Sequence, residues 1–112
     1  MIETSLYDYL NTKQGIPLYL EAPKVLPSKY YLMEKTGGNM ENHIRHSTII
    51  IQSCAATLYD AAVMNEDIIS LMLYDAVTLA DVASISLNSN YNYTDPTTRQ
   101  HRYQAVFDVV HY

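Results

Sequence analysis

The sequence is poor in several residue types that would each point to a particular class of protein. It has one cysteine, Cys54, so a disulfide framework within the chain is excluded. Its three glycines form no phosphate-binding motif. No apolar run approaches the ~20 residues of a membrane span, and the N-terminus lacks the basic start of a signal peptide. We therefore expect synthesis in a reducing, intracellular compartment and no membrane partner.

Basic residues are also scarce. Seven Lys and Arg face twelve Asp and Glu, which gives a formal charge of −5. The basic residues are scattered and form no stripe that would follow a phosphate backbone, which argues against sequence-specific DNA binding. Hydrophobic residues make up 48% of the chain and charged residues 17%, which excludes a disordered chain. A length of 112 residues predicts one domain, residues 1–112.

The aromatic residues are mostly tyrosine: eleven Tyr, one Phe and no Trp. Tyrosine combines a large apolar ring with a polar tip, which suits a surface that is wet before assembly and dry after it. Tyrosine is also a good strand former, and this explanation carries equal weight.

Two segments have helical patterns. Apolar residues recur at helical spacing in residues 2–14, and Gly15 follows as a C-cap. Thr57 begins a second helix that should fade near Asp75, with Asp60 three residues on as the second half of a capping box. The small residues Ala61 and Ala62 predict close contact between this helix and a sheet.

Five segments are predicted strands: residues 16–22, 29–36, 46–55, 82–94 and 102–112. Residues 37–46 lack periodicity and are predicted as a long, mobile hairpin loop, and residues 94–98 as a turn. Residues 82–94 alternate most regularly, and this pattern predicts one buried face with Ala83, Ile85, Leu87, Tyr91 and Tyr93. The predicted fold class is α+β: two layers, with two helices packed on a mixed, mainly antiparallel sheet of about five strands.

Candidate catalytic and metal-binding residues are few. His43 and His46 are three residues apart in the predicted loop, while His101 and His111 lie far downstream, so we expect solvent-facing histidines and no metal site. Cys54 ends an apolar strand and is expected to be a buried, structural residue. Glu66 and Asp67 are neighbours on a predicted solvated helix face. We predict no catalytic residue, no cofactor and no enzymatic activity.

The chain as a whole resembles the small tail-terminator, or tail-completion, proteins of long-tailed bacteriophages and prophages. The resemblance covers most of the chain. The order and spacing of the matching segments are more specific than any one segment by itself. The segments that carry it are the N-terminal helix followed by IPLYLEAP at 16–23, KYYLMEKTGG at 29–38, IQSCA at 51–55 leading into the helix with Ala61 and Ala62, and RYQAVFD at 102–108. The Lys- and Pro-containing linker near 23–29 and the Asn-rich strand depart from the family pattern.

This resemblance implies a structural virion protein of the tail and neck, assembled in the host cytoplasm. Family members form a ring, commonly of six subunits, that caps the major tail tube protein, ends its polymerisation and joins the tail to the head-completion or stopper protein. DNA passes through the lumen of the ring without specific binding, and an acidic chain suits that passage. The family has no cofactor and no active site.

A cyclic ring requires two different complementary patches on each subunit. The last strand has a surplus apolar face, and the predicted loop could become ordered against a neighbour. The candidate subunit-interface residues are Met40, Ile44, Val106, Val110 and Tyr112. The alternative for the last strand is that this face packs within the monomer. Two other functions also remain open: a neighbouring neck protein of similar size, and a monomeric binding or regulatory domain.

Overall fold

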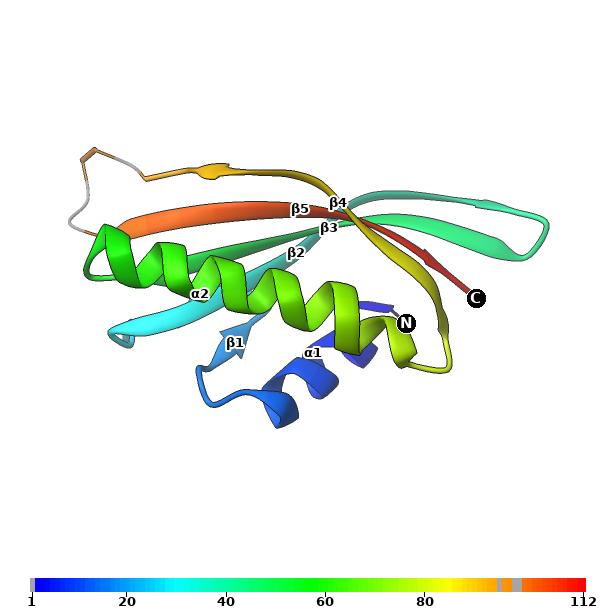
Figure 1. Ribbon diagram of the computed structural model, residues 1–112, viewed down its shortest axis with the longest axis horizontal. Coiled ribbons are helices and arrows are strands. Elements are labelled where there is room, and N and C mark those ends of the chain that lie inside the picture. Colours follow the sequence, from blue (N-terminus) through cyan, green and yellow to red (C-terminus); the bar gives the residue numbers. More distant parts are fainter. Residues whose placement is uncertain (1, 95, 98–99) are drawn as a thin grey trace.

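The computed structural model describes residues 2–94, 96–97 and 100–112. Within them the chain forms two α-helices and a five-stranded sheet with strand order β1-β2-β3-β5-β4 (Figure 1). The β1–β2 pair is parallel and the other pairs are antiparallel. The predicted α+β class is therefore confirmed. The turn predicted over residues 94–98 lies partly outside the described residues.

Both helices form where their apolar patterns predict them, but Gly15 lacks the positive φ of a glycine C-cap, so that part of the prediction is wrong. Helix α1 (Ile2–Lys13) buries Ile2, Leu6 and Leu10 along one side. Helix α2 (Leu58–Ser70) begins after Thr57, whose hydroxyl accepts a 3.1 Å hydrogen bond from the Asp60 backbone N–H. The Asp60 carboxylate lies 4.0 Å from Lys29 Nζ, so it contacts the start of β2. After α2 the chain continues through a π-helical segment (Leu71–Asp75) and a 3-10 turn (Ala76–Thr78), slightly beyond the predicted end near Asp75.

The first predicted strand is much shorter than expected. Residues 16–22 contain only β1 (Leu18–Tyr19), which pairs in parallel with Tyr31 and Leu32 of β2. Asn11 of α1 fixes this segment, because its side chain accepts from the Leu18 N–H and donates to the Leu18 carbonyl, both at 3.1 Å. Of the alternating apolar residues, Leu18 is buried and Ile16 half-buried, whereas Leu20 and Ala22 are exposed, so the alternation does not mark a long half-buried strand.

The predicted loop over residues 37–46 is wrong. Strands β2 (Lys29–Glu41) and β3 (Ile44–Ala55) stay paired to their ends and enclose a two-residue turn, Asn42–His43. Both turn residues have positive φ, 51° and 66°, as a type I′ hairpin turn requires. Gly37 and Gly38 lie within β2, beside a bulge between Lys35 and Gly37, and not in the turn. We call residues 34–47 the hairpin arm; it projects beyond the helices in Figure 1.

Strand β4 (Val82–Asn92) contains two register shifts that the regular alternation does not predict. The shift between Leu87 and Ser89 leaves Asn88 as an extra residue, so the side chains after it change face. Leu87 pairs with the buried Phe107 of β5 (His101–His111), whereas Ser89 pairs with Val106 on the opposite face. The prediction of one common face for Ile85, Leu87, Tyr91 and Tyr93 is therefore wrong.

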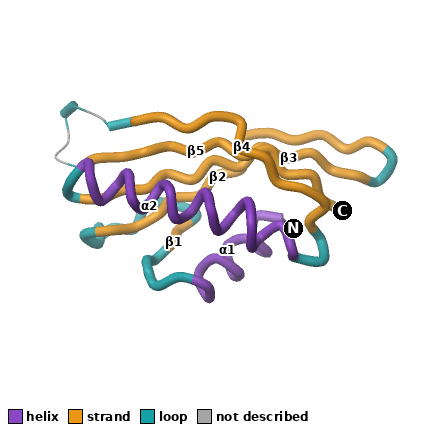
Figure 2. Tube along the Cα trace, viewed as in Figure 1, coloured by secondary structure: helices purple, strands orange, loops and turns teal. Residues whose placement is uncertain are grey.

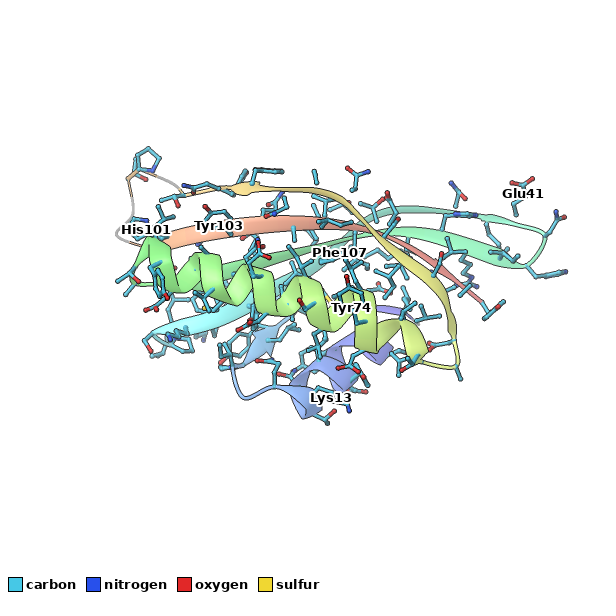
Figure 3. The ribbon with its side chains drawn as sticks, viewed as in Figure 1. Lys13, Glu41, Tyr74, His101, Tyr103 and Phe107 are labelled. Atoms are coloured by element: carbon cyan, nitrogen blue, oxygen red, sulfur yellow. The ribbon has the colours of Figure 1, made fainter. Side chains whose placement is uncertain are left out.

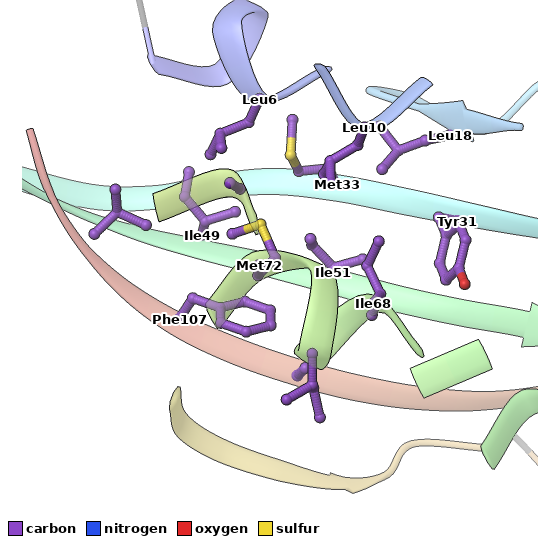
Figure 4. Close-up of a cluster of buried hydrophobic side chains, with 14 of the residues drawn as sticks. Leu6, Leu10, Leu18, Tyr31, Met33, Ile49, Ile51, Ile68, Met72 and Phe107 are labelled. Atoms are coloured by element: carbon purple, nitrogen blue, oxygen red, sulfur yellow. The ribbon is translucent and has the colours of Figure 1, made fainter. Parts of the chain in front are cut away.

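The hydrophobic core lies between one face of the sheet and both helices, as the tube view shows (Figure 2). Figure 4 shows Leu6 and Leu10 of α1 and Ile68 of α2 meeting sheet residues such as Ile51 and Phe107. Tyr31 ends this core, with its hydroxyl donating a 3.0 Å hydrogen bond to the Met64 carbonyl. The helices cover one face only, and the opposite face of the sheet has no helix on it in the described residues. We call that opposite face the open face.

Candidate assembly surface

The open face is defined by strand pairing, because residues opposite each other on neighbouring strands share a face. On β3 and β5 the buried Ile51 pairs with Ala105, and Ile49 with Phe107; these residues face the helices. The residues between them, Ile50 and Val106, pair with each other on the open face. Leu32 of β2 and Val110 of β5 extend the apolar part of this face, and all four side chains are half-buried.

Four of the five predicted interface residues lie on the open face. Val106 and Val110 occupy it along β5, and Ile44 continues it at the end of β3. Arg45 pairs with His111, so Ile44 and Tyr112 come next to each other beyond that pair. Tyr112 is 67% exposed, and Ile44 is 38% exposed. None of these side chains is fully covered by the single chain.

Met40, the fifth residue, lies on the other side of the hairpin arm. It pairs with Arg45, which alternates with Ile44, so its side chain faces away from the open face. Met40 is 61% exposed. With Lys35, Gly38, Arg45 and Ser47 it lines a hollow of about 470 Å³ on the helix side of the arm. The structure thus separates Met40 from the other four predicted residues.

A line of hydrogen-bonded polar side chains crosses the open face and was not predicted. Arg102 Nη1 donates to Gln52 Oε1 at 3.4 Å, Gln52 Nε2 to Gln104 Oε1 at 3.0 Å, and Gln104 Nε2 to the Tyr91 hydroxyl at 2.5 Å. The line joins β3, β5 and β4, and it gives the apolar part of the face a fixed polar border. The sequence shows only one glutamine within each of two apolar strands, β3 and β5. It does not show that these glutamines meet, because they are distant in the sequence and only strand pairing aligns them.

A second polar contact fixes the bulge of β4. Asn88 Nδ2 donates to the Asp108 carboxylate at 3.1 Å, on the same face as Val106 and Val110. The open face is also hollowed near the arm, where His46, Asp108 and Val110 line a space of about 270 Å³. This hollow connects the predicted C-terminal patch to the base of the hairpin arm.

Cys54 is fully buried, as predicted, although it faces away from the helices. It pairs with Tyr30 of β2 and Arg102 of β5. Burial raises the pKa of the Cys54 thiol, and the nearby Arg102 only partly offsets this effect. Tyr30 is itself 0% exposed, and its hydroxyl donates to Gln100 Oε1 at 2.8 Å. The thiol therefore stays protonated near neutral pH, in keeping with a structural residue.

The histidines divide into exposed and buried groups. His43 and His46 are exposed on the arm, as predicted, and His101 is half-buried. His111 is buried, which the prediction of solvent-facing histidines missed, and its Nε2 lies 2.8 Å from Ser47 Oγ. Burial lowers the pKa of His111, and Lys35 and Arg45 lower it further, whereas Asp81 acts in the opposite direction.

Side chains that could hold a metal ion do not gather anywhere in the part of the chain that the structure describes. Glu66 and Asp67 are exposed on α2, as predicted. Figure 3 shows how the polar side chains are distributed over the sheet and helices, with Glu41 at the end of the arm. In the described residues, no helix is long and apolar enough to cross a membrane.

Comparison of the chain with known protein families and with curated proteins finds no match.

Proposed function

We propose that this protein is a structural ring subunit of the tail-terminator class. In this proposal, copies of the chain form a ring, with six subunits as the expected number, at the end of a phage tail tube. The ring stops the addition of tail tube protein and provides the surface that joins the tail to the head-completion or stopper protein. DNA passes through the lumen without being bound specifically.

The uncovered apolar part of the open face carries the proposal. A chain of this size forms one helix layer, and that layer covers only one face of the sheet. Leu32, Ile50, Val106 and Val110 remain half-buried on the other face, with Tyr112 and Ile44 more exposed beside them. These residues form two apolar groups, one around Leu32, Ile50 and Val106 and one around Val110 near the arm, and the Thr48–Asp108 pair lies between them. Uncovered apolar groups bordered by polar side chains are typical of a protein–protein interface. The fold and the segment order that resembles the family add support.

The acidic charge suits the same role. A net charge of −5 disfavours tight binding of DNA, which has to slide through the lumen. Ser84, Ser86 and Ser89 line the β4 side of the open face without charge, next to the carboxylate of Asp108.

Replacing Val110 and Tyr112 together with Asp tests the proposal. Two carboxylates on the open face would repel a neighbouring subunit of like charge while leaving the core untouched. We expect sedimentation velocity to show rings for the natural protein and monomers for the Val110→Asp/Tyr112→Asp variant, with unchanged far-UV circular dichroism. A natural protein that is sharply monomeric at all accessible concentrations would contradict the proposal and favour a monomeric binding domain.

Val109→Asp is the matched control. Val109 is next to Val110 but faces the helices and is almost fully buried. A charge there has no partner, so this variant should unfold where the open-face variant does not. A terminator is then distinguished from a neighbouring neck protein by adding the natural protein to polymerising tail tube subunits: a terminator gives shorter tubes with a density cap at one end.

A further inference from the structure

The sheet has two free edges, on opposite sides of the molecule. Strand β1 covers β2 only at Tyr31 and Leu32, so within the described residues the hairpin arm has no sheet neighbour on its outer edge. Strand β4 forms the other end of the strand order, and among the described residues it pairs only with β5. In Figure 1, β4 rises from the lower right, crosses β5 and then runs along the upper border of the sheet, and the arm projects at one end.

Backbone groups on β4 point outward without a partner strand. The Tyr93 N–H donates to the Arg102 carbonyl of β5 at 2.8 Å. Because successive residues of a strand point their N–H groups in opposite directions, the N–H groups of Asn92 and Asn90 point away from β5. Such a row of donors and acceptors is a template for another strand.

The sequence of β4 does little to protect this edge. Proteins commonly protect edge strands with charged residues, proline or β-bulges, and Val82–Asn92 contains no charged residue and no proline. The bulges near Ala83 and Asn88 divide the edge into short stretches. They would limit pairing to a short partner strand and oppose indefinite sheet growth.

The hairpin arm and this edge are alike in carrying no net charge. The arm carries Lys35 and Arg45 against Glu34 and Glu41, a net charge of zero, and β4 carries no charge. The whole charge of −5 therefore lies elsewhere, so two copies of the chain meet with least repulsion at these two edges. Exposed apolar side chains also lie on both, Met40 on the arm and Leu87 on β4.

We propose that the hairpin arm of one subunit pairs with the β4 edge of the next subunit and continues its sheet. This inference rests on the proposed ring function and adds how neighbouring subunits join. Because the two edges differ and lie on opposite sides, the pairing is head-to-tail, and each subunit uses its arm for one neighbour and β4 for the other. Such a contact closes into a ring when the rotation between subunits allows it.

Cross-linking between single cysteines tests the pairing. Asn39 on the arm and Ser86 on β4 are exposed and both lie on the open face, since they pair with His46 and Asp108. Asn39→Cys and Ser86→Cys subunits, mixed before assembly and treated with a short bismaleimide, should give covalent dimers. The double variant should give a ladder that ends at the ring size. Either single variant alone should remain uncross-linked.

Two controls accompany this experiment. The natural Cys54 is 0% exposed, so the natural protein should not react. Ser70→Cys places an exposed thiol at the end of α2, outside both edge strands, and should give no product with either partner variant.

Sedimentation of the untreated variants separates failure of the pairing from failure of the function. If rings form but the mixed variants give no dimers, the pairing is refuted and the ring function stands. If Ser86→Cys alone gives dimers, β4 pairs with β4 and the head-to-tail arrangement is wrong. If no assembly forms at all, the proposed function and the pairing both fall.

Discussion

At the residue scale, most residues have the role that their local sequence predicts. Thr57 caps α2, Leu6 and Leu10 are buried, and Cys54 is a buried thiol. The exceptions are residues whose surroundings come from distant segments. His111 is the clearest, because its burial depends on Ser47 of β3 and on the arm, which are more than sixty residues away.

His111 should make the stability depend on pH. Its folded-state pKa is lowered, first by burial, so the unfolded chain binds more protons at mildly acidic pH. The free energy of unfolding should therefore fall as the pH drops below about 6.5, the unfolded value. Urea denaturation between pH 7.5 and pH 5 checks this. In the His111→Gln variant, which keeps a polar partner for Ser47, the free energy of unfolding should fall less steeply with decreasing pH. An equal pH dependence in both proteins would contradict the assignment to His111.

At the element scale, helix α2 packs closely against β3 and β5. Ala61 is fully buried, whereas Ala62 is half-buried on the side of the helix. The sequence alone suggested that both alanines meet the sheet, and the structure assigns the close contact to Ala61. The helix pattern predicted the element correctly, but its rotation about its own axis is set by the sheet beneath it.

Ala61→Phe should therefore destabilise the fold more than Ala62→Phe. Forcing a ring into the contact between α2 and the sheet overpacks the core, at a cost of about 1–3 kcal/mol, occasionally more. At Ala62, on the side of the helix, a phenylalanine ring has room. The loss of stability in Ala62→Phe should therefore be well below that range. Chemical denaturation of the two variants measures the difference, and equal losses would show that the helix sits with both alanines against the sheet.

The strands illustrate what periodicity can and cannot predict. In β2, Tyr31 and Met33 face the helices, whereas Tyr30 and Leu32 face the other side, as the alternation of an extended strand requires. The regular alternation of β4 was misleading, because the extra residue Asn88 changes the face of every side chain that follows. A bulge leaves no mark in a pattern of apolar and polar residues when both sides of it keep alternating.

At the scale of the whole molecule, the arm and the open face dominate the shape. The chain measures 45 × 25 × 25 Å with a radius of gyration of 13.8 Å, against roughly 13 Å for a compact chain of this length. The excess fits an arm that extends beyond the helix layer. In the proposed ring, the arm and β4 supply the two different patches that cyclic assembly requires.

Assembly should also appear in the thermal stability. Subunit association stabilises the folded state by mass action, so the Tm of the natural protein should rise by a few degrees for each tenfold increase in protein concentration. The Val110→Asp/Tyr112→Asp variant should have a Tm that does not change with concentration. Differential scanning calorimetry over a hundredfold range checks both, and a constant Tm for the natural protein would argue against assembly.

The sequence by itself determined the type and order of the elements and the Thr57 N-cap of α2. These features depend on neighbours within one turn or one strand, and the chain carries them locally. Only the tertiary structure decided the strand order, the short parallel pairing of β1, the bulge at Asn88 and the face of the sheet left open. Each of these is a pairing between distant segments, chosen by the packing of the whole domain.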